Sequence, residues 1–246
     1  MKFSRLAFTA LFGVSLSLCA SPITYNFLTG PNTNTNAFGN SIVYTVNGVT
    51  VTATAWGLTG NPSNTTLQSA ELMAWPNANP AFAFGLGVCD RSEGTNCPVF
   101  GSDPAQLDNI GVYDFVMFQF SSPITLSTIT INPDSIFNDD RDVSYSVCND
   151  VNPSNLTGST AAGVCGAFTT INNSASLNPL TITLTGTGNT LFFGAAYPTT
   201  DNNDGFKIDN LTVSYVGDSQ VPEPASFALF GLGLSVLGLA RRMKKA

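Results

Sequence analysis

Residues 124–131 read ITLSTITI, a run in which apolar and polar residues alternate with one slip. Alternation with a period of two predicts a β-strand with one buried face, because successive side chains point to opposite faces. We expect Ile124, Leu126 and, after the slip, Ile129 and Ile131 to face a core. Similar short runs, bounded by Gly, Pro, Asn or Asp, predict further strands at Ile23–Phe27, Ser41–Val46, Val49–Trp56, Ala81–Val88, Tyr113–Phe120, Val143–Val147, Leu180–Thr185, Thr190–Ala196 and Phe206–Val216.

This series of short strands with turn residues between them predicts an all-β fold, an antiparallel β-sandwich or jelly roll. A small barrel is the alternative, because periodicity does not separate the two. Asn47-Gly48 predicts a two-residue hairpin turn, and Ser121-Ser122-Pro123 predicts a second tight connection. The aromatic run at 113–120 predicts a central strand, and we expect long loops at 32–40 and 149–178.

The N-terminal residues 1–20 have the layout of a secretory signal peptide. Lys2 and Arg5 precede an apolar run at 6–18, and small residues follow at Cys19 and Ala20. We therefore expect a signal helix, export of the chain, and a mature β domain at 21–216. An N-terminal anchor that is never cut is the alternative.

The C-terminal residues predict a membrane segment. A linker at 217–224 leads to an uncharged, mostly apolar run at 225–240. As a helix this run is about 24 Å long, slightly less than the roughly 30 Å hydrocarbon core. The basic tail at 241–246 should stay in the cytoplasm by the positive-inside rule, which leaves the β domain outside. A simple C-terminal membrane anchor is one interpretation.

The same tail resembles a known sorting signal. Pro222, Glu223 and Pro224, one apolar helix, and the pair Arg241 and Arg242 stand in the order of the PEP-CTERM signal of Gram-negative bacteria. The resemblance implies that exosortase, a membrane-embedded protease, removes the tail and sends the body onward. It also implies an inner-membrane-anchored precursor, a final location at the outer surface or in the extracellular matrix, and an association with exopolysaccharide.

The charge of the chain is concentrated in its middle. All 16 acidic residues lie between Glu71 and Glu223, and only Arg91, Arg141 and Lys207 oppose them there, which leaves −13. Such a body repels nucleic acid and anionic lipid head groups and attracts cations. We expect no nucleic acid among its partners.

The chain contains no histidine. This excludes Ser-His-Asp and Cys-His catalysis and histidine-ligated metals. Carboxylate chemistry remains, and glycoside hydrolysis needs a pair of carboxylates. The candidates are Asp108 with Asp114, or a pair among Asp139, Asp140 and Asp142, although Asp-rich turns are common without catalysis. We assign no catalytic residue.

Four cysteines remain if Cys19 leaves with the signal peptide, and an even number in an exported chain predicts disulfides. Of the three possible pairings, the spacing favours the local one, Cys89–Cys97 with Cys148–Cys165. A zinc site is disfavoured because the chain has neither histidine nor a C-x-x-C motif.

The loop DNNDGF offers oxygen ligands for calcium from Asp201, Asn203 and Asp204. The acidic patch at 138–142 adds ligands if the fold brings it close. The alternative is a polar turn in which Asp and Asn side chains bond their own backbone.

Aromatic side chains suit the apolar faces of sugar rings, and Trp56, Trp75 and Tyr197 are the candidates. Core packing is the alternative for each. Because Pro and Asn follow it, we expect Trp75 to be the exposed aromatic. Residues 204–216 also resemble the last strand of jelly-roll carbohydrate-binding modules.

The sequence thus leads to one expected function and two alternatives. We expect an exported, non-enzymatic surface or matrix protein with a structural or adhesive role in exopolysaccharide. A calcium-assisted carbohydrate-binding module is the first alternative, and a carboxylate-dependent glycoside hydrolase is the second.

Overall fold

One strand of 20 residues, β8 (Asp114–Pro133), connects most of the sheet in the computed structural model of the chain. The structure describes residues 21–29, 37–59, 66–75, 84–93, 105–133, 140–198 and 203–215. The predicted signal peptide, linker, membrane helix and basic tail lie outside these residues. No helix in the described segments has the length and apolar character needed to cross a membrane.

The remaining elements are short. The strands are β1 (Ser21–Asn26), β2 (Ser41–Val46), β3 (Val49–Leu58), β4 (Leu67–Ser69), β5 (Glu71–Trp75), β6 (Gly85–Cys89), β7 (Leu107–Asp108), β9 (Val143–Cys148), β10 (Thr169–Ile171), β11 (Leu180–Thr183), β12 (Thr187–Ala195) and β13 (Gly205–Tyr215). The helices are η1 (Pro153–Asn155), a single 3-10 turn, and α1 (Ala161–Cys165).

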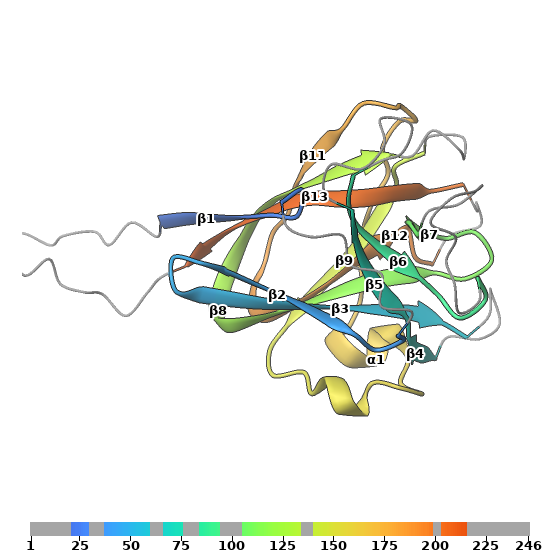
Figure 1. The fold of residues 1–246 in the computed structure, drawn as a ribbon, viewed down its shortest axis with the longest axis horizontal. Coiled ribbons are helices and arrows are strands. Elements are labelled where there is room, and N and C mark those ends of the chain that lie inside the picture. Colours follow the sequence, from blue (N-terminus) through green and yellow to red (C-terminus); the bar gives the residue numbers. More distant parts are fainter. Residues whose placement is uncertain are drawn as a thin grey trace, which may run out of the picture. The chain divides into compact units, whose positions relative to one another are not determined.

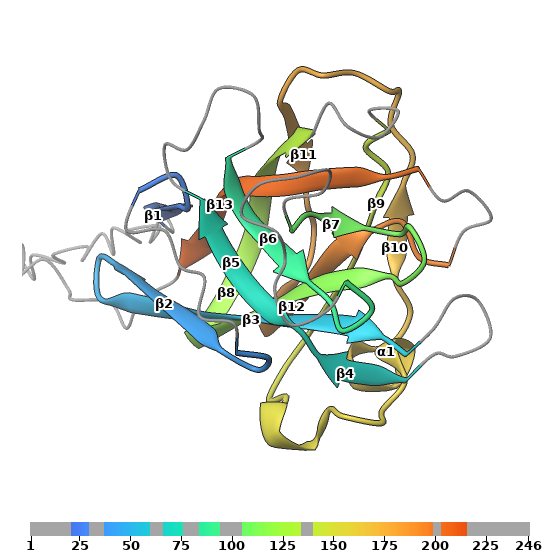
Figure 2. The same ribbon diagram turned by 45° about the vertical axis from the view of Figure 1, so that its right-hand side comes forward.

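These strands form one hydrogen-bonded sheet with a main path β10-β9-β12-β8-β13-β6-β5 (Figure 1; β10 is labelled in Figure 2). β3 also pairs with β8 and carries β2 and β4, while β1 and β7 pair with β13 and β11 pairs with β8. The ladders with a defined register are antiparallel, which confirms the predicted all-β, antiparallel fold. The pairing does not divide the strands into two separate sheets, so a sandwich or jelly roll is not confirmed.

The predicted tight connection at Ser121-Ser122-Pro123 is wrong, because these residues lie inside β8. Up to Phe120 the strand pairs with β3, and from Thr125 onward it pairs with β13. Between these two ladders no described neighbour stands in register with residues 121–123. Pro123 is therefore tolerated in the strand, since no ladder hydrogen bond is required of its missing N–H.

The hairpin turn and the slip in the alternation are confirmed. Asn47 and Gly48 have φ angles of 50° and 79°, as a two-residue turn with two positive φ angles requires. The slip is a bulge in β8. Thr212 pairs with Thr128 and Val213 with Leu126, which leaves Ser127 without a register partner on β13. Leu126 and Ile129 consequently both face the core.

Four strands and two helical turns of the described residues were not predicted from the sequence. β4, β7 and β10 have two or three residues each, and β5 is buried on both faces and so does not alternate. The segment expected to be a long loop at 149–178 contains η1, α1 and β10. Its α1 is only five residues long, and Thr160 caps it by accepting a hydrogen bond from the Gly163 N–H (3.0 Å).

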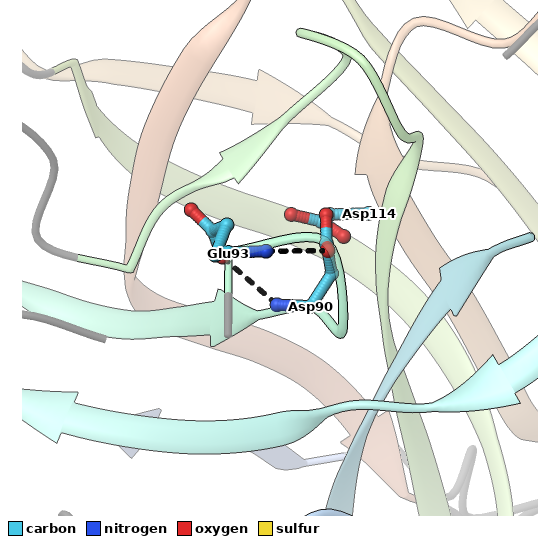
Figure 3. A group of neighbouring side chains, drawn as sticks. All are labelled: Asp90, Glu93 and Asp114. Atoms are coloured by element: carbon cyan, nitrogen blue, oxygen red, sulfur yellow. Dashed lines mark hydrogen bonds between the residues drawn. The ribbon is translucent and has the colours of Figure 1, made fainter. Parts of the chain in front are cut away.

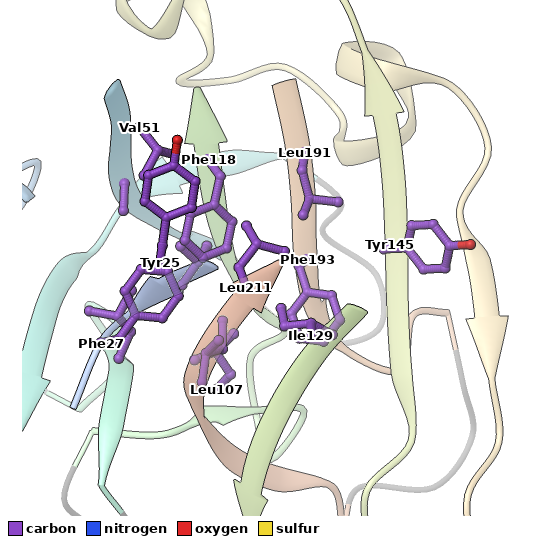
Figure 4. Packing of buried hydrophobic residues seen from close by; sticks show 14 of the residues in the cluster. Tyr25, Phe27, Val51, Leu107, Phe118, Ile129, Tyr145, Leu191, Phe193 and Leu211 are labelled. Carbon is purple, nitrogen blue, oxygen red and sulfur yellow. The ribbon is translucent and has the colours of Figure 1, made fainter. Parts of the chain in front are cut away.

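The sheet encloses a main core made by both halves of β8 and by the strands around them. Phe118 lies in this core and stacks on Phe27, with ring centroids 5.6 Å apart. Figure 4 shows these rings close to Tyr25, Val51 and Leu211. The opposite face of the N-terminal half of β8 carries a second apolar cluster, which packs beneath α1 and includes Trp56, Phe115, Met117, Leu156 and Phe192.

We predict that Phe118→Ala destabilises the fold by about 3 to 5 kcal/mol, because it removes a fully buried aromatic side chain and leaves a cavity. Urea denaturation of the exported protein measures the change. Thr125→Ala, at an exposed position of the same strand, should change stability by less than about 0.5 kcal/mol. Similar losses in the two variants would contradict the assignment of Phe118 to the core.

Candidate metal centre

Two groups of acidic side chains converge in the described part of the chain. We call Asp140, Asp142 and Asp204 the first cluster, and Asp90, Glu93 and Asp114 the second cluster. In each cluster, one carboxylate oxygen from every member lies within 4.8 Å of the others. Like charges this close favour binding of a proton or a cation.

The first cluster joins segments that are more than 60 residues apart in the sequence. Asp140 and Asp142 precede β9, and Asp204 immediately precedes β13. Asp140 and Asp204 form an isolated parallel bridge. The Gly205 N–H also donates to the Asp140 carbonyl (3.4 Å). Backbone pairing therefore holds the two acidic segments side by side.

Hydrogen bonds orient the buried carboxylate of Asp204. Its Oδ1 accepts from the Asp142 N–H (3.0 Å), and its Oδ2 accepts from Asn109 Nδ2 (2.6 Å). The Asp204 N–H donates in turn to Asn109 Oδ1 (3.1 Å). Asp142 is also fixed, because its Oδ1 accepts from the Asn173 N–H (2.5 Å). The two carboxylates are thus preorganised by amide donors.

Asn203 adds a neutral oxygen beside the first cluster. Its Nδ2 donates to Asp140 Oδ2 (3.2 Å), and Asp140 Oδ1 accepts from the Arg141 N–H (2.9 Å). The Oδ1 atom of Asn203 is buried and accepts no hydrogen bond from any described residue. An amide oxygen left in this state is a suitable ligand for a hard cation.

The Arg141 guanidinium donates its hydrogen bonds to backbone carbonyls. Its Nε and Nη2 donate to the Ser174 carbonyl (3.0 and 2.5 Å), and its Nη1 donates to the Asn178 carbonyl (2.9 Å). The first cluster offers three carboxylates, and Asn203 beside it carries one amide oxygen. Calcium takes six to eight oxygen ligands, so water or bidentate coordination would complete the shell.

The predicted calcium ligands agree in part with this geometry. Asp204 belongs to the first cluster, Asn203 lies beside it with a hydrogen bond to Asp140, and Asp201 lies outside the described residues. The acidic patch at 138–142 contributes Asp140 and Asp142. Asn109 and Asn173 were not predicted from the sequence, because they act as hydrogen-bond partners from distant segments and carry no local motif.

The second cluster was not predicted as a unit. Asp90 follows β6 and Glu93 lies in the next turn, while Asp114 begins β8 (Figure 3). The Asp90 N–H donates to Glu93 Oε2 (2.8 Å), and Asp90 Oδ1 accepts from the N–H groups of Ser92 and Glu93. Gly57, opposite Asp114 on β3, keeps space for these side chains, because a Cβ there would lie 3.1 Å from Asp90 Cβ.

The carboxylates suggested for glycoside hydrolysis do not lie together in one site. Asp114 joins the second cluster, and Asp140 and Asp142 join the first. Asp108 Oδ1 accepts from the Ile110 N–H (2.9 Å) in a local turn. Asp139 lies outside the described residues.

Trp75 is not the exposed aromatic that the sequence predicted. Its side chain is only 9% exposed and lies in a small cluster with Met73, Cys89 and Ala105. The β5 strand turns it to the face opposite the main core, where Lys207 Nζ lies 5.8 Å from its ring centroid. Pro and Asn after it suggested exposure, but non-local packing covers the ring.

The other two aromatic candidates also pack against apolar neighbours. Trp56 is buried, and Tyr197 makes edge contacts with the rings of Tyr113, Phe115 and Phe168.

Cys148 and Cys165 form a disulfide that connects β9 to the end of α1, with their Cα atoms 5.2 Å apart. This is one of the two local pairs expected from the spacing. Cys89 is also disulfide-bonded, and Cys97 lies outside the described residues.

Asp209 is a buried carboxylate on β13 that belongs to neither cluster. Its Oδ1 makes no hydrogen bond within the described segments. Burial raises the pKa of Asp209 to about 7, because loss of hydration disfavours the charged form. In the unfolded chain the pKa of an Asp is about 4. Between these pH values the folded protein binds a proton that the unfolded chain has released.

We therefore predict that Asp209 lowers stability as the pH rises from about 4 to about 7. Asp209→Asn should increase the free energy of unfolding by roughly 2 to 4 kcal/mol at pH 8 and change it little at pH 4. Urea unfolding at both pH values measures the effect. Asp150→Asn makes the same replacement at an exposed site and serves as the control. An equal gain at pH 4 and pH 8 would rule out this explanation.

Comparison with known proteins concerns the C-terminal tail. A family model described as the PEP-CTERM protein-sorting motif matches residues 220–245. No curated protein matches the chain. The matched residues include Pro222, Glu223 and Pro224 and the pair Arg241 and Arg242, all outside the described residues. The chain is thus a protein with a C-terminal PEP-CTERM sorting motif.

Proposed function

We propose that this chain is an exported, non-enzymatic protein of the cell surface or extracellular matrix, with a structural or adhesive role in exopolysaccharide. The match of residues 220–245 to the PEP-CTERM sorting motif carries the proposal, because this motif supports an exported protein that exosortase sorts. The precursor is held in the inner membrane through 225–240 until the tail is removed.

The described surface suits contact with a hydrated polysaccharide. Exposed threonine side chains from facing strands bond to each other across the sheet, as in Thr24–Thr212 (2.9 Å) and Thr130–Thr181 (3.0 Å). Further exposed pairs are Thr45–Thr50 and Thr125–Thr187. Such pairs stabilise the strands modestly and leave an uncharged, hydroxyl-rich surface.

The burial of the carboxylates supports a non-enzymatic role. Asp90, Asp114, Asp142 and Asp204 are all buried. A hydrolase must bring two carboxyl groups to the two sides of a glycosidic bond. Side chains enclosed in this way are better suited to holding an ion than to contacting a sugar chain.

We also propose that the sheet folds over its main core as a sandwich or jelly roll. Support comes from the composition of that core, in which Phe118 and Ile129 from the two halves of β8 meet Tyr25 of β1 and Leu86 of β6.

The sorting proposal predicts that the mature protein lacks its C-terminal tail. Mass spectrometry of the protein from its native host should find no peptide that contains Lys245 and Ala246, whereas a host without exosortase should retain that peptide. Replacing residues 222–224 by three alanines should leave the tail attached and the protein in the membrane fraction.

Asp218→Ala changes a polar residue in the same linker, just outside the matched motif, and should be processed normally. An intact tail in the unmodified host, or normal processing of the triple-alanine variant, would show that the motif is not used as proposed.

A calcium-assisted carbohydrate-binding module is the second candidate, and the geometry of the first cluster favours it. The three carboxylates form part of an oxygen shell that hydrogen bonds already hold in place, and Asn203, which donates to Asp140, carries a buried amide oxygen beside it. Bound calcium would reduce the repulsion among Asp140, Asp142 and Asp204 and stiffen the ends of β9 and β13.

We predict that calcium at 100 times its dissociation constant stabilises the protein by about 2.7 kcal/mol and that excess chelator removes this gain. Thermal melting and calorimetric titration with calcium measure it. Asp204→Asn should abolish calcium binding, and Glu93→Gln in the second cluster should leave it unchanged. Polysaccharide pull-down with calcium or chelator then tests the role of the ion in binding sugar.

Melting curves unaffected by calcium and chelator would exclude the ion. Loss of calcium binding in Glu93→Gln alone would move the site to the second cluster.

A further inference from the structure

The N-terminal quarter of the β domain carries no charge. No Asp, Glu, Lys, Arg or His occurs between residues 6 and 70, although the middle of the chain has a net charge of −13. This neutral stretch forms β1, β2, β3 and β4. Two copies of so acidic a protein repel each other over most of their surface, so close approach is least costly where these strands are exposed.

β2 is the exposed margin of this neutral region (Figure 2). In the described residues it pairs only with β3, on one side. Ile42, Tyr44 and Val46 pack against the main core, and Ser41, Val43 and Thr45 point to solvent. Val43 is 58% exposed, and Leu177 (55%) is the other large hydrophobic side chain so exposed among the described residues.

The turn at Asn47-Gly48 determines which backbone groups of β2 point away from β3. In a two-residue hairpin the residues flanking the turn, Val46 and Val49, form a hydrogen-bonded pair. Alternation along the ladder then turns the N–H and C=O groups of Ser41, Val43 and Thr45 away from β3. Consistent with this register, the Thr50 N–H points away from β2 and donates to Ser121 Oγ (3.1 Å).

Both ends of β2 are held in place. The two-residue turn fixes one end, and the Asn40 side chain fixes the other. Asn40 Oδ1 accepts from the Leu72 N–H (2.7 Å), and Asn40 Nδ2 donates to the Leu72 carbonyl (2.8 Å). The outer edge of β2, which has no partner among the described residues, is therefore held in an extended form that loses little further freedom on pairing.

β2 lacks the features that protect other sheet edges from pairing. Charged residues, proline and short length are the usual protections. β1 contains Pro22, β5 begins with Glu71, β10 has three residues and β11 has four. β2 has six residues, no charge and no proline.

We propose that β2 is a self-association edge, at which β2 of a second copy of this chain pairs antiparallel to form one sheet across a two-fold dimer. The outward groups lie on odd-numbered residues, so hydrogen bonds form only where odd-numbered residues face each other. The register with most bonds pairs Val43 with Val43 of the partner subunit, and Ser41 with Thr45 of the partner subunit. The exposed Val43 side chains then cover each other at the centre.

Disulfide trapping tests this register on the exported protein from its host. In a hydrogen-bonded antiparallel pair the Cα atoms are about 5.5 Å apart, within the range of a disulfide. Val43→Cys should therefore give a covalent dimer under mild oxidation. Thr45→Cys is the matched control, because the Cα atoms of two such residues would lie about 14 Å apart in this register. Tryptic peptide mapping identifies the bond that forms.

Charge placed on the edge tests the association itself. Val43→Lys brings two ammonium groups together at the two-fold axis and should weaken dimerisation roughly tenfold or more in sedimentation equilibrium. Leu177→Lys replaces the other exposed hydrophobic side chain and leaves the edge intact, so its dimerisation should match that of the unmodified protein. Equal melting temperatures of the variants show that folding is retained.

A monomer at all concentrations in the unmodified protein would overturn the proposal, and so would equal weakening by the two lysine variants. Trapping through Thr45→Cys, or through neither cysteine, overturns the Val43-centred pairing. If Val43→Lys instead abolishes polysaccharide binding by a monomeric protein, the edge is a sugar-contact surface and not a dimer interface.

Discussion

The fold depends on the hydrogen-bonded ladders of β8. Its N-terminal half pairs with β3 and β12, and its C-terminal half pairs with β13 and β11. Because one strand belongs to both regions, the main core is continuous along it, from Phe118 to Ile129. Residues 121–123 have no cross-strand register partner in the described sheet. Before them β8 pairs with β3, and after them it pairs with β13.

The same ladders position the acidic clusters near strand ends. Asp114 begins β8, Asp142 precedes β9 and Asp204 precedes β13. Strand pairing brings such residues together from distant parts of the sequence, and amide donors such as Asn109 and the Asn173 N–H then orient them. Because most charged residues of the β domain are acidic, the two clusters are suited to binding cations. The uncharged β2 edge is suited to pairing with a second copy of the chain.

The sequence predicted the candidate site only in part, for a definite physical reason. The loop DNNDGF and the acidic patch at 138–142 were recognisable because their carboxylates lie within a few residues of each other, and they supplied Asp204, Asp140 and Asp142. The grouping of Asp90 and Glu93, which follow β6, with Asp114 at the start of β8 depends on the tertiary fold, which no local pattern reports. For Trp75 the prediction was wrong. The Pro and Asn that follow it in the sequence suggested exposure, but residues that are distant in the sequence bury its side chain.

The sequence by itself determined several features, because each depends on residues that are close together in the chain. Side-chain alternation identified most strands, the two positive φ angles favoured by Asn47-Gly48 specified the hairpin, and the ordered tail motif indicated sorting. Only the tertiary structure decided that 121–123 continues a strand, which carboxylates meet, and which strand has a neighbour on one side alone among the described residues. These features depend on contacts between residues far apart in the chain, and a periodic pattern records only which face of a strand is apolar, not which strand it will meet.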